Sequence, residues 1–187
     1  DAVGVFAPSL KPAAFADWLR QRIVRLKPAT LVNLTAFSAQ GADGTPSPLD
    51  AAGCPVFQIA LSTAQHKDWT GEERGLSPAD LAMHVVLPEV DGRIFAGVAS
   101  FKSAARRDPD LQYARVTHCA DAGRVAAIAD RIAAWHRLQR LDPADKRLTL
   151  ILSTYPGKRH QLAHAVGLDA LASCETILKT LARNGYD

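Results

Sequence analysis

Two carboxylates, Glu89 and Asp91, have the residue types and the spacing to do chemistry together. A carboxylate can accept a proton from a substrate, and it can also ligate a hard divalent cation. Both residues follow Pro88, and Asp91-Gly92 is a turn dipeptide, so they lie at a corner between two elements, where loops often carry function. The residues alone also allow a structural role, in which the Glu89 carboxylate only caps backbone amides.

A histidine, His84, lies in the helix predicted before this corner. One helical turn would bring it near Glu89 if the helix packs back on the corner. Transition metals accept imidazole nitrogen readily, so His84 and Glu89 are candidate metal ligands. The alternative for His84 is a hydrogen-bonded histidine in the core or at its edge.

A second pair of histidines, His160 and His164, has the four-residue spacing of H-E-x-x-H zinc sites. Gln161 replaces the glutamate, so the general base of a metalloprotease is missing. The segment is predicted as a loop, which leaves an adventitious divalent-metal site or a solvated loop as the interpretations.

Four other side chains are candidates for binding a ligand: Ser38, Gln40, Gln58 and Trp69. Ser38 and Gln40 follow a predicted strand, and ligands of open α/β sheets bind outside the carboxyl ends of strands. Gln58 could point from its own strand into the same crevice, and the Trp69 indole could stack on a flat ligand. The alternatives are solvation for Ser38 and Gln40, a satisfied buried amide for Gln58 and a hydrophobic anchor for Trp69.

The elements that position the corner carry local signals. Ser77 is an N-cap residue type, Pro78 suits the first helical position, and Asp80 can reach back towards the cap. Pro88 is expected to end this helix, because it lacks an N–H and disfavours helical geometry at the residue before it. A strand over 94–100 follows the turn.

The rest of the chain alternates predicted strands and helices. Further strands are expected at 2–7, 31–36, 56–61, 113–117 and 148–152, and helices are expected to begin at Pro12, Asp121 and Leu171. This order predicts an α/β fold with a mostly parallel sheet flanked by helices. We expect residues 1–140 to form one α/β domain. The strand-helix unit 147–187 either completes the same sheet or begins a second α/β subdomain.

Composition excludes several classes of protein. The chain has 187 residues with a net charge of +3 and no basic run with interleaved aromatics, which argues against nucleic acid as a partner. No apolar run approaches the roughly 20 residues of a membrane span. Three distant cysteines predict a reducing compartment, the cytoplasm. The phosphate-loop, G-x-G-x-x-G and G-x-S-x-G motifs are all missing.

Six parts of the sequence are distinctive together: GLSPADLAMHVVLPEVDGRI (75–94), LVNLTAFSAQG (31–41), CPVFQIALS (54–62), Trp69, AVGLD (165–169) and ILKTLARNGYD (177–187). They resemble segments, in the same order, of the large subunits of cobaltochelatase and, more distantly, of magnesium chelatase. The resemblance covers nearly the whole chain. Because these large subunits are several times longer, we expect the chain to be an internal fragment of one.

The resemblance implies insertion of cobalt(II) into a corrin precursor, hydrogenobyrinic acid a,c-diamide, in cobalamin biosynthesis. This is a ligase reaction that forms nitrogen–metal bonds, in which cobalt(II) is a substrate. Glu89 matches the glutamate of the family's Leu-Pro-Glu motif and would be the base or metal ligand, with Asp91 and His84 in support. The ring site would then be lined by Ser38, Gln40, Gln58 and Trp69.

The resemblance also implies partners. ATP and magnesium would be bound by separate ATPase subunits and not by this chain, and the isolated fragment is expected to be inactive. Two alternatives remain: a magnesium chelatase large subunit acting on protoporphyrin IX, or a non-catalytic scaffold that docks the ATPase subunits. A sugar- or nucleotide-binding α/β module is a further alternative, with no motif behind it.

Overall fold

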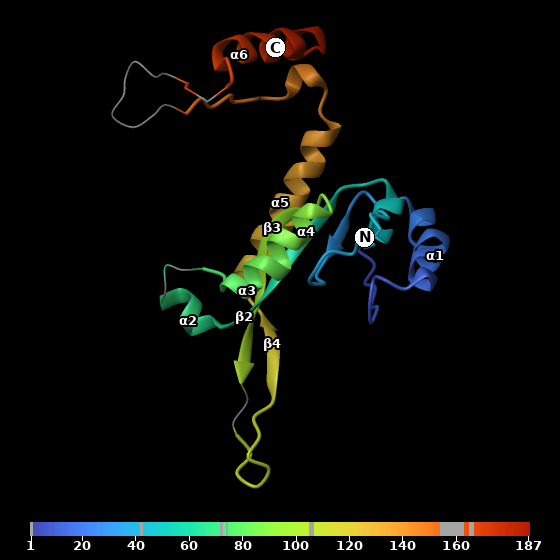
Figure 1. Ribbon diagram of the computed structural model, residues 1–187, viewed down its shortest axis with the longest axis vertical. Coiled ribbons are helices and arrows are strands. Elements are labelled where there is room, and N and C mark those ends of the chain that lie inside the picture. The colour runs from blue at the N-terminus through green and yellow to red at the C-terminus, as the bar shows by residue number, and fades with distance from the viewer. Residues whose placement is uncertain are drawn as a thin grey trace. The chain divides into compact units, whose positions relative to one another are not determined.

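The chain divides into two compact units, residues 1–133 and residues 134–187. The computed structural model (Figure 1) describes residues 2–41, 43–71, 73, 75–104, 107–153, 163–164 and 167–187. The predicted domains, 1–140 and 147–187, stay a prediction.

A four-stranded sheet in the order β1-β2-β3-β4 forms the centre of the first unit. The strands are β1 (Leu31–Asn33), β2 (Val56–Gln65), β3 (Ile94–Ala104) and β4 (Val116–Ala120). The first three strands run parallel, and β4 pairs antiparallel with β3. The predicted α/β fold with a mostly parallel sheet is therefore confirmed.

Helices pack on both faces of this sheet, because neighbouring residues of a strand point to opposite sides. Ile59 of β2 belongs to a core cluster with Ile128 of α5 (Ala122–Arg140), whereas Ala60 belongs to a cluster that includes Trp69 of α2 (His66–Gly71). A third cluster joins Leu19 of α1 (Ala13–Arg22) to the short helices η1 (Val24–Leu26) and η2 (Pro48–Ala52).

The helical segment before the corner is continuous from Pro78 to Val90 (Figure 1). It consists of α3 (Pro78–Leu81), a π-turn (Ala82–Val86) and α4 (Leu87–Val90). The prediction that Pro88 ends this helix is wrong, since Leu87 keeps helical angles of φ −65° and ψ −42°. The wider π-turn relieves the contact that a proline ring makes with the preceding turn of a regular α-helix.

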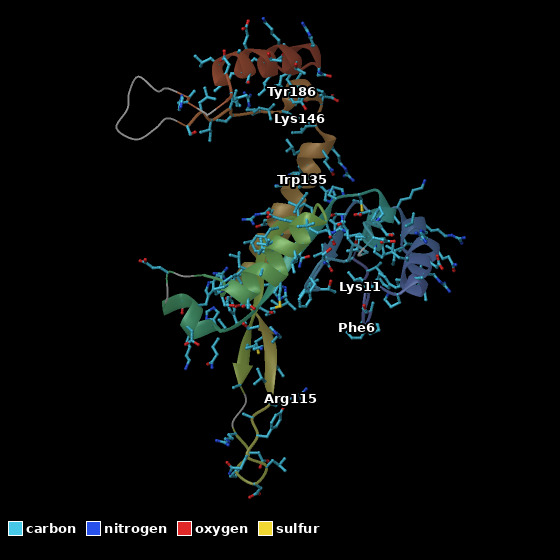
Figure 2. All side chains as sticks on the ribbon, in the orientation of Figure 1. Phe6, Lys11, Arg115, Trp135, Lys146 and Tyr186 are labelled. Atoms are coloured by element: carbon cyan, nitrogen blue, oxygen red, sulfur yellow. The ribbon has the colours of Figure 1, made fainter. Side chains whose placement is uncertain are left out.

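The second unit contains the short helix η4 (Pro143–Asp145) and α6 (Ala170–Arg183). As predicted, Asn184 ends α6, and Gly185 follows with a positive φ of 81°. The Lys146 ammonium lies 5.7 Å from the centre of the Tyr186 ring (Figure 2).

Three strand predictions need correction. Residues 2–7 and 148–152 form no strand, because no described segment pairs with their backbones, and an apolar run without a partner strand cannot form a ladder. The strand predicted at 113–117 is shifted to Val116–Ala120, where it pairs with β3. The predicted helix starts near Pro12, Asp121 and Leu171 are confirmed.

Among the described residues, the structure has no helix with both the length and the hydrophobicity to cross a bilayer.

Gly97 of β3 is required by the packing of α5. Its φ is +143°, a conformation that other residues rarely adopt, and an added Cβ would lie 3.2 Å from Ile128 Cγ1. Gly97→Ala should therefore lower the free energy of unfolding by about 1–3 kcal/mol in urea denaturation. The control is Gly71→Ala, where a Cβ meets no described atom within 4 Å and the free energy should change little. An equal effect in both variants would contradict this account.

Candidate functional site

The π-turn leaves one backbone carbonyl, that of Met83, without a helical partner. The Leu87 N–H, its α-helical donor, bonds instead to the Ala82 carbonyl, and Pro88, its π-helical donor, has no N–H. The N–H of Phe37 donates to the Met83 carbonyl at 2.8 Å. The unusual helix thus creates an acceptor for the loop at 37–41, which follows β1.

The buried carboxylate of Asp91 holds the same loop. The Ser38 hydroxyl donates to Asp91 Oδ1, and the Ala39 N–H donates to Oδ2 at 2.6 Å. The Ser38 oxygen in turn accepts from the N–H of Gln40 at 3.2 Å. Only 2% of the Asp91 side chain is exposed. One carboxylate therefore fixes three consecutive residues of the loop.

Arg93 extends this contact to a third segment. Its Nη1 donates to Asp50 Oδ1 of η2 at 2.6 Å, and its Nη2 lies 3.9 Å from Asp91 Oδ2. The second distance is an ion-pair contact and too long for a hydrogen bond, and Nη2 is enclosed without a hydrogen-bond partner in the described part of the chain. We call Ser38, Ala39, Asp50, Asp91 and Arg93 the corner network.

Ser38 and Asp91 are therefore brought together, but as partners of each other. Both oxygens of Asp91 accept hydrogen bonds from the loop, so this carboxylate holds the loop and is not open to a substrate proton. Their predicted roles in substrate binding and catalysis stay predictions. Asp91 fits a positioning role in this structure.

Glu89 differs from Asp91 in the exposure of its side chain and in the partners of its carboxylate. Its side chain is exposed at the end of α4, and no described residue forms a hydrogen bond or ion pair with its carboxylate. Its backbone carbonyl accepts from the N–H of Gly92 at 2.8 Å, which closes the turn. The fixed backbone presents a free carboxylate, as a base or a metal ligand requires.

His84 lies in the π-turn and is buried. Burial lowers the pKa of its imidazole, the Asp80 carboxylate opposes this effect, and His118 adds to it. Asp80 does not reach back to the helix cap as expected. Its N–H donates to the Ser77 hydroxyl at 3.1 Å, while its carboxylate accepts from Thr63 of β2.

Gln58 is a buried amide whose hydrogen bonds are made within the protein. Its Oε1 accepts from Asn33 Nδ2 at 2.8 Å, and its Nε2 donates to the carbonyls of Thr35 at 2.9 Å and Ile59 at 3.3 Å. A ligand would have to replace these bonds. These bonds match the alternative of a satisfied buried amide and tie β1 to β2, and the role of Gln58 in ligand binding stays a prediction.

Gln40 lines a cavity of about 870 Å³ beside α1. Lys11, which precedes α1 (Figure 2), and Arg20 bring positive charge to its wall, and Asp50 of the corner network also borders it. Alanine and proline side chains supply much of the remaining wall. The volume lies within the range of small-molecule sites in proteins.

Trp69 is half-buried and packs against other side chains. Its ring centre lies 5.3 Å from that of Phe101, and the Arg124 guanidinium lies 4.9 Å from the Trp69 ring centre. This arrangement matches the hydrophobic-anchor alternative, and the stacking role stays a prediction.

A smaller cavity, of about 350 Å³, lies beside Phe101 and is lined by His66 and Asp121. The His66 Nε2 lies 2.9 Å from Asp121 Oδ2. The pKa of Asp121 is lowered mainly by the N–H of Arg124, which its carboxylate accepts at the start of α5, and further by His66.

The histidine pair cannot be assessed as a site. His160 and Gln161 lie outside the described residues, and His164 lies within them. In the part of the chain that the structure describes, no three His, Cys, Asp or Glu side chains gather where they could hold a metal ion. Glu89 and His84 would therefore need ligands from a substrate or from solvent.

Sequence reasoning missed two charged residues of this region, Arg93 and Asp50. A usable signal existed for Arg93, because an arginine that opens a buried strand must find an anionic partner. The partner itself, 43 positions away, has no local signal.

Residues 1–187 match the model of the CobN/Magnesium Chelatase family, and the chain belongs to this family. It is 37% identical to the aerobic cobaltochelatase subunit CobN of Sinorhizobium sp, over 99% of this chain and 15% of that protein. It is 27% identical to the chloroplastic magnesium-chelatase subunit ChlH of Oryza sativa subsp. indica, over 71% of this chain and 9% of that protein.

A solved structure is similar as well. It is the catalytic subunit of cobaltochelatase from Mycobacterium tuberculosis, with a TM-score of 0.69 and 30% identity over 94% of this chain and 14% of that one. The chain thus spans about one seventh of the length of the two cobaltochelatase relatives.

The corner network should dominate the stability of the first unit. Asp91→Ala leaves the buried Arg93 short of a counter-charge and should lower the free energy of unfolding by about 3–5 kcal/mol. Ser38→Ala removes one hydrogen bond to a charged group and should cost about 1–3 kcal/mol. Urea denaturation measures both.

Asp17→Ala is the matched control, because Asp17 pairs with Arg20 at 3.0 Å on the exposed surface. Its free energy of unfolding should stay within about 1 kcal/mol of wild type. Similar losses in Asp91→Ala and Asp17→Ala would refute the central role of the corner network.

Proposed function

We propose that this chain is a segment of the large subunit of an ATP-dependent cobalt chelatase, which inserts cobalt(II) into hydrogenobyrinic acid a,c-diamide. The observation that carries the proposal is that the sequence identity is higher to cobaltochelatase subunits than to a magnesium-chelatase subunit. The chain is 37% and 34% identical to two aerobic cobaltochelatase subunits, over 99% and 95% of its length. It is 27% identical to the rice magnesium-chelatase subunit, over 71% of its length.

Glu89 is the residue that we assign to the chemistry. Metal insertion into a tetrapyrrole requires removal of two pyrrole protons and loss of water from the metal, and a free carboxylate can serve either step. Glu89 is exposed and free of partners among the described residues, whereas Asp91 is committed to the loop. Asp91 therefore supports the site by holding its geometry, and His84 is a second metal ligand.

The cavity beside Gln40 is the place that we assign to the corrin precursor. A corrin precursor is a flat apolar ring with carboxylate and amide arms. The alanine- and proline-rich wall suits the ring, while Lys11, Arg20 and Gln40 suit the arms. The corner network holds Ala39 in the same wall.

ATP and magnesium belong to partner subunits in this proposal. The chain carries no phosphate-loop motif, so ATPase subunits would hold the nucleotide and supply conformational work. The cytoplasm remains the predicted location, consistent with the three free cysteines.

A second candidate is magnesium insertion into protoporphyrin IX, for which the 27% and 25% identity to two magnesium-chelatase subunits is weaker support. A third is a scaffold that docks ATPase subunits, favoured by the small share of the relatives that the chain covers. Under that hypothesis the ring and the metal would bind elsewhere in the large subunit.

Glu89→Gln in the full-length subunit should lower the rate of cobalt insertion by about 10²–10⁴-fold, because the amide neither accepts a proton nor carries charge. Folding should be unaffected, since the carboxylate has no partner among the described residues. Glu73→Gln, the same change at another exposed glutamate, is the matched control. Full insertion activity in Glu89→Gln would remove this residue from the mechanism.

Titration of the chain with hydrogenobyrinic acid a,c-diamide should show saturable quenching of tryptophan fluorescence in the micromolar range. Combined Lys11→Ala and Arg20→Ala should weaken binding about tenfold, because each cation contributes a modest exposed contact. Arg22→Ala is the control, since Arg22 lies on α1 but does not line the cavity.

Unaltered binding in the double variant would exclude this cavity as the ring site. Absence of binding by the folded chain, with binding by the full-length subunit, would instead favour the scaffold hypothesis.

A further inference from the structure

Two enclosed polar atoms of the helical segment 78–90 have no hydrogen-bond partner among the described residues: Asp80 Oδ1 and His84 Nδ1. Enclosed polar atoms without partners are rare in native proteins, and each one calls for an explanation. Asp80 and His84 are four residues apart along one helical segment, a spacing that makes neighbours on a helix face. One atom can only accept a hydrogen bond, and the other can donate one.

The carboxylate of Asp80 is held in a fixed orientation. Its Oδ2 accepts from the Thr63 N–H at 2.8 Å, from the Thr63 hydroxyl at 2.9 Å and from the Ser62 hydroxyl at 3.3 Å. The residue is fully buried. Since β2 takes one oxygen completely, the other oxygen is left for a donor from elsewhere.

The two nitrogens of the His84 imidazole differ, because only Nδ1 is among the enclosed polar atoms without a partner in the described part of the chain. Since Nδ1 is buried in this way, Nε2 is the nitrogen that remains for a ligand. A neutral imidazole carries its proton on only one of its two nitrogens, so the other nitrogen is an acceptor. His118, the other titratable group that acts on His84, has its Nδ1 3.2 Å from the Ser100 hydroxyl.

We propose that Asp80 is a positioning residue for His84: its Oδ1 accepts the Nδ1–H of the neutral imidazole and leaves Nε2 as the bare nitrogen. The two atoms do not meet hydrogen-bond geometry in this structure. The attraction between the Asp80 carboxylate and His84 acts beyond hydrogen-bond distance, so it favours the same tautomer without a ligand. Carboxylates that orient metal-binding histidines work in this way.

The assignment of cobalt(II) to Nε2 rests on the proposed function, whereas the choice of tautomer does not. Asp80→Asn should reverse the tautomer. The donors on Ser62 and Thr63 require an oxygen, so the carboxamide oxygen must face them and the NH₂ group must face His84. A donor in that place makes Nδ1 the acceptor and moves the proton to Nε2.

The test is ¹⁵N NMR of the histidine side chains in the 187-residue chain near pH 7.5, with His84→Gln used for assignment. The two ring nitrogens have distinct shifts when one is protonated and the other bare. We expect a protonated Nδ1 in wild type and a protonated Nε2 in Asp80→Asn. The matched control is Asp121→Asn, which should alter His66 and leave His84 unchanged.

A wild-type His84 protonated on Nε2 would overturn the proposal. So would an unchanged tautomer in folded Asp80→Asn. If that variant does not fold, the wild-type tautomer alone decides.

Addition of cobalt(II) separates this proposal from the proposed function. Cobalt(II) should broaden the His84 ring signals, and Asp80→Asn should weaken that binding about 10–100-fold. The expected tautomer without cobalt broadening would support the role of Asp80 and remove His84 as a metal ligand. Cobalt broadening with the opposite tautomer would overturn the proposal and leave the metal site intact.

Discussion

The attachment of the loop 37–41 to the helical corner is the constraint on which the rest of this region depends. Two unlike acceptors hold it: the Met83 carbonyl, which the π-turn and Pro88 leave without a helical donor, and the buried Asp91 carboxylate. Phe37 accepts a positive φ of 67° as part of this arrangement, a costly conformation for an aromatic residue. The same contacts place Ala39 and Gln40 in the wall of the larger cavity.

Much of the fold followed from local sequence signals. The caps at Ser77 and Asp121, the turn at Asp91-Gly92 and the apolar strands β2 and β3 depend on neighbours in the chain, and all were predicted. Predictions failed where the local structure depends on residues far away in the sequence or on the geometry of the preceding turn. Residues 148–152 have the composition of a strand without a strand to pair with, and the effect of Pro88 depends on whether the preceding turn is α or π.

The site was only partly predictable for the same reason. Sequence identified Glu89, Asp91, Ser38 and Gln40 as polar groups near strand ends, but not that Ser38 and Asp91 satisfy each other across 53 positions. Gln58 was a candidate because it could point from its strand into the same crevice, and its hydrogen bonds in the structure tie β1 to β2. The Asp80 side chain was expected to reach back to the cap, but Thr63, which donates to its carboxylate, lies on another element.

The burial of Arg93 and Asp91 also determines how the corner responds to ionic strength. Dissolved ions weaken attraction between charges only when they can come between them or surround them. The two side chains are 3% and 2% exposed, so salt has little access to this pair. Pairs on the surface, such as Arg20 with Asp17, lose their attraction as salt rises. The attraction between Arg93 and Asp91 should therefore change little between dilute buffer and concentrated salt, whereas the attraction between Arg20 and Asp17 should weaken.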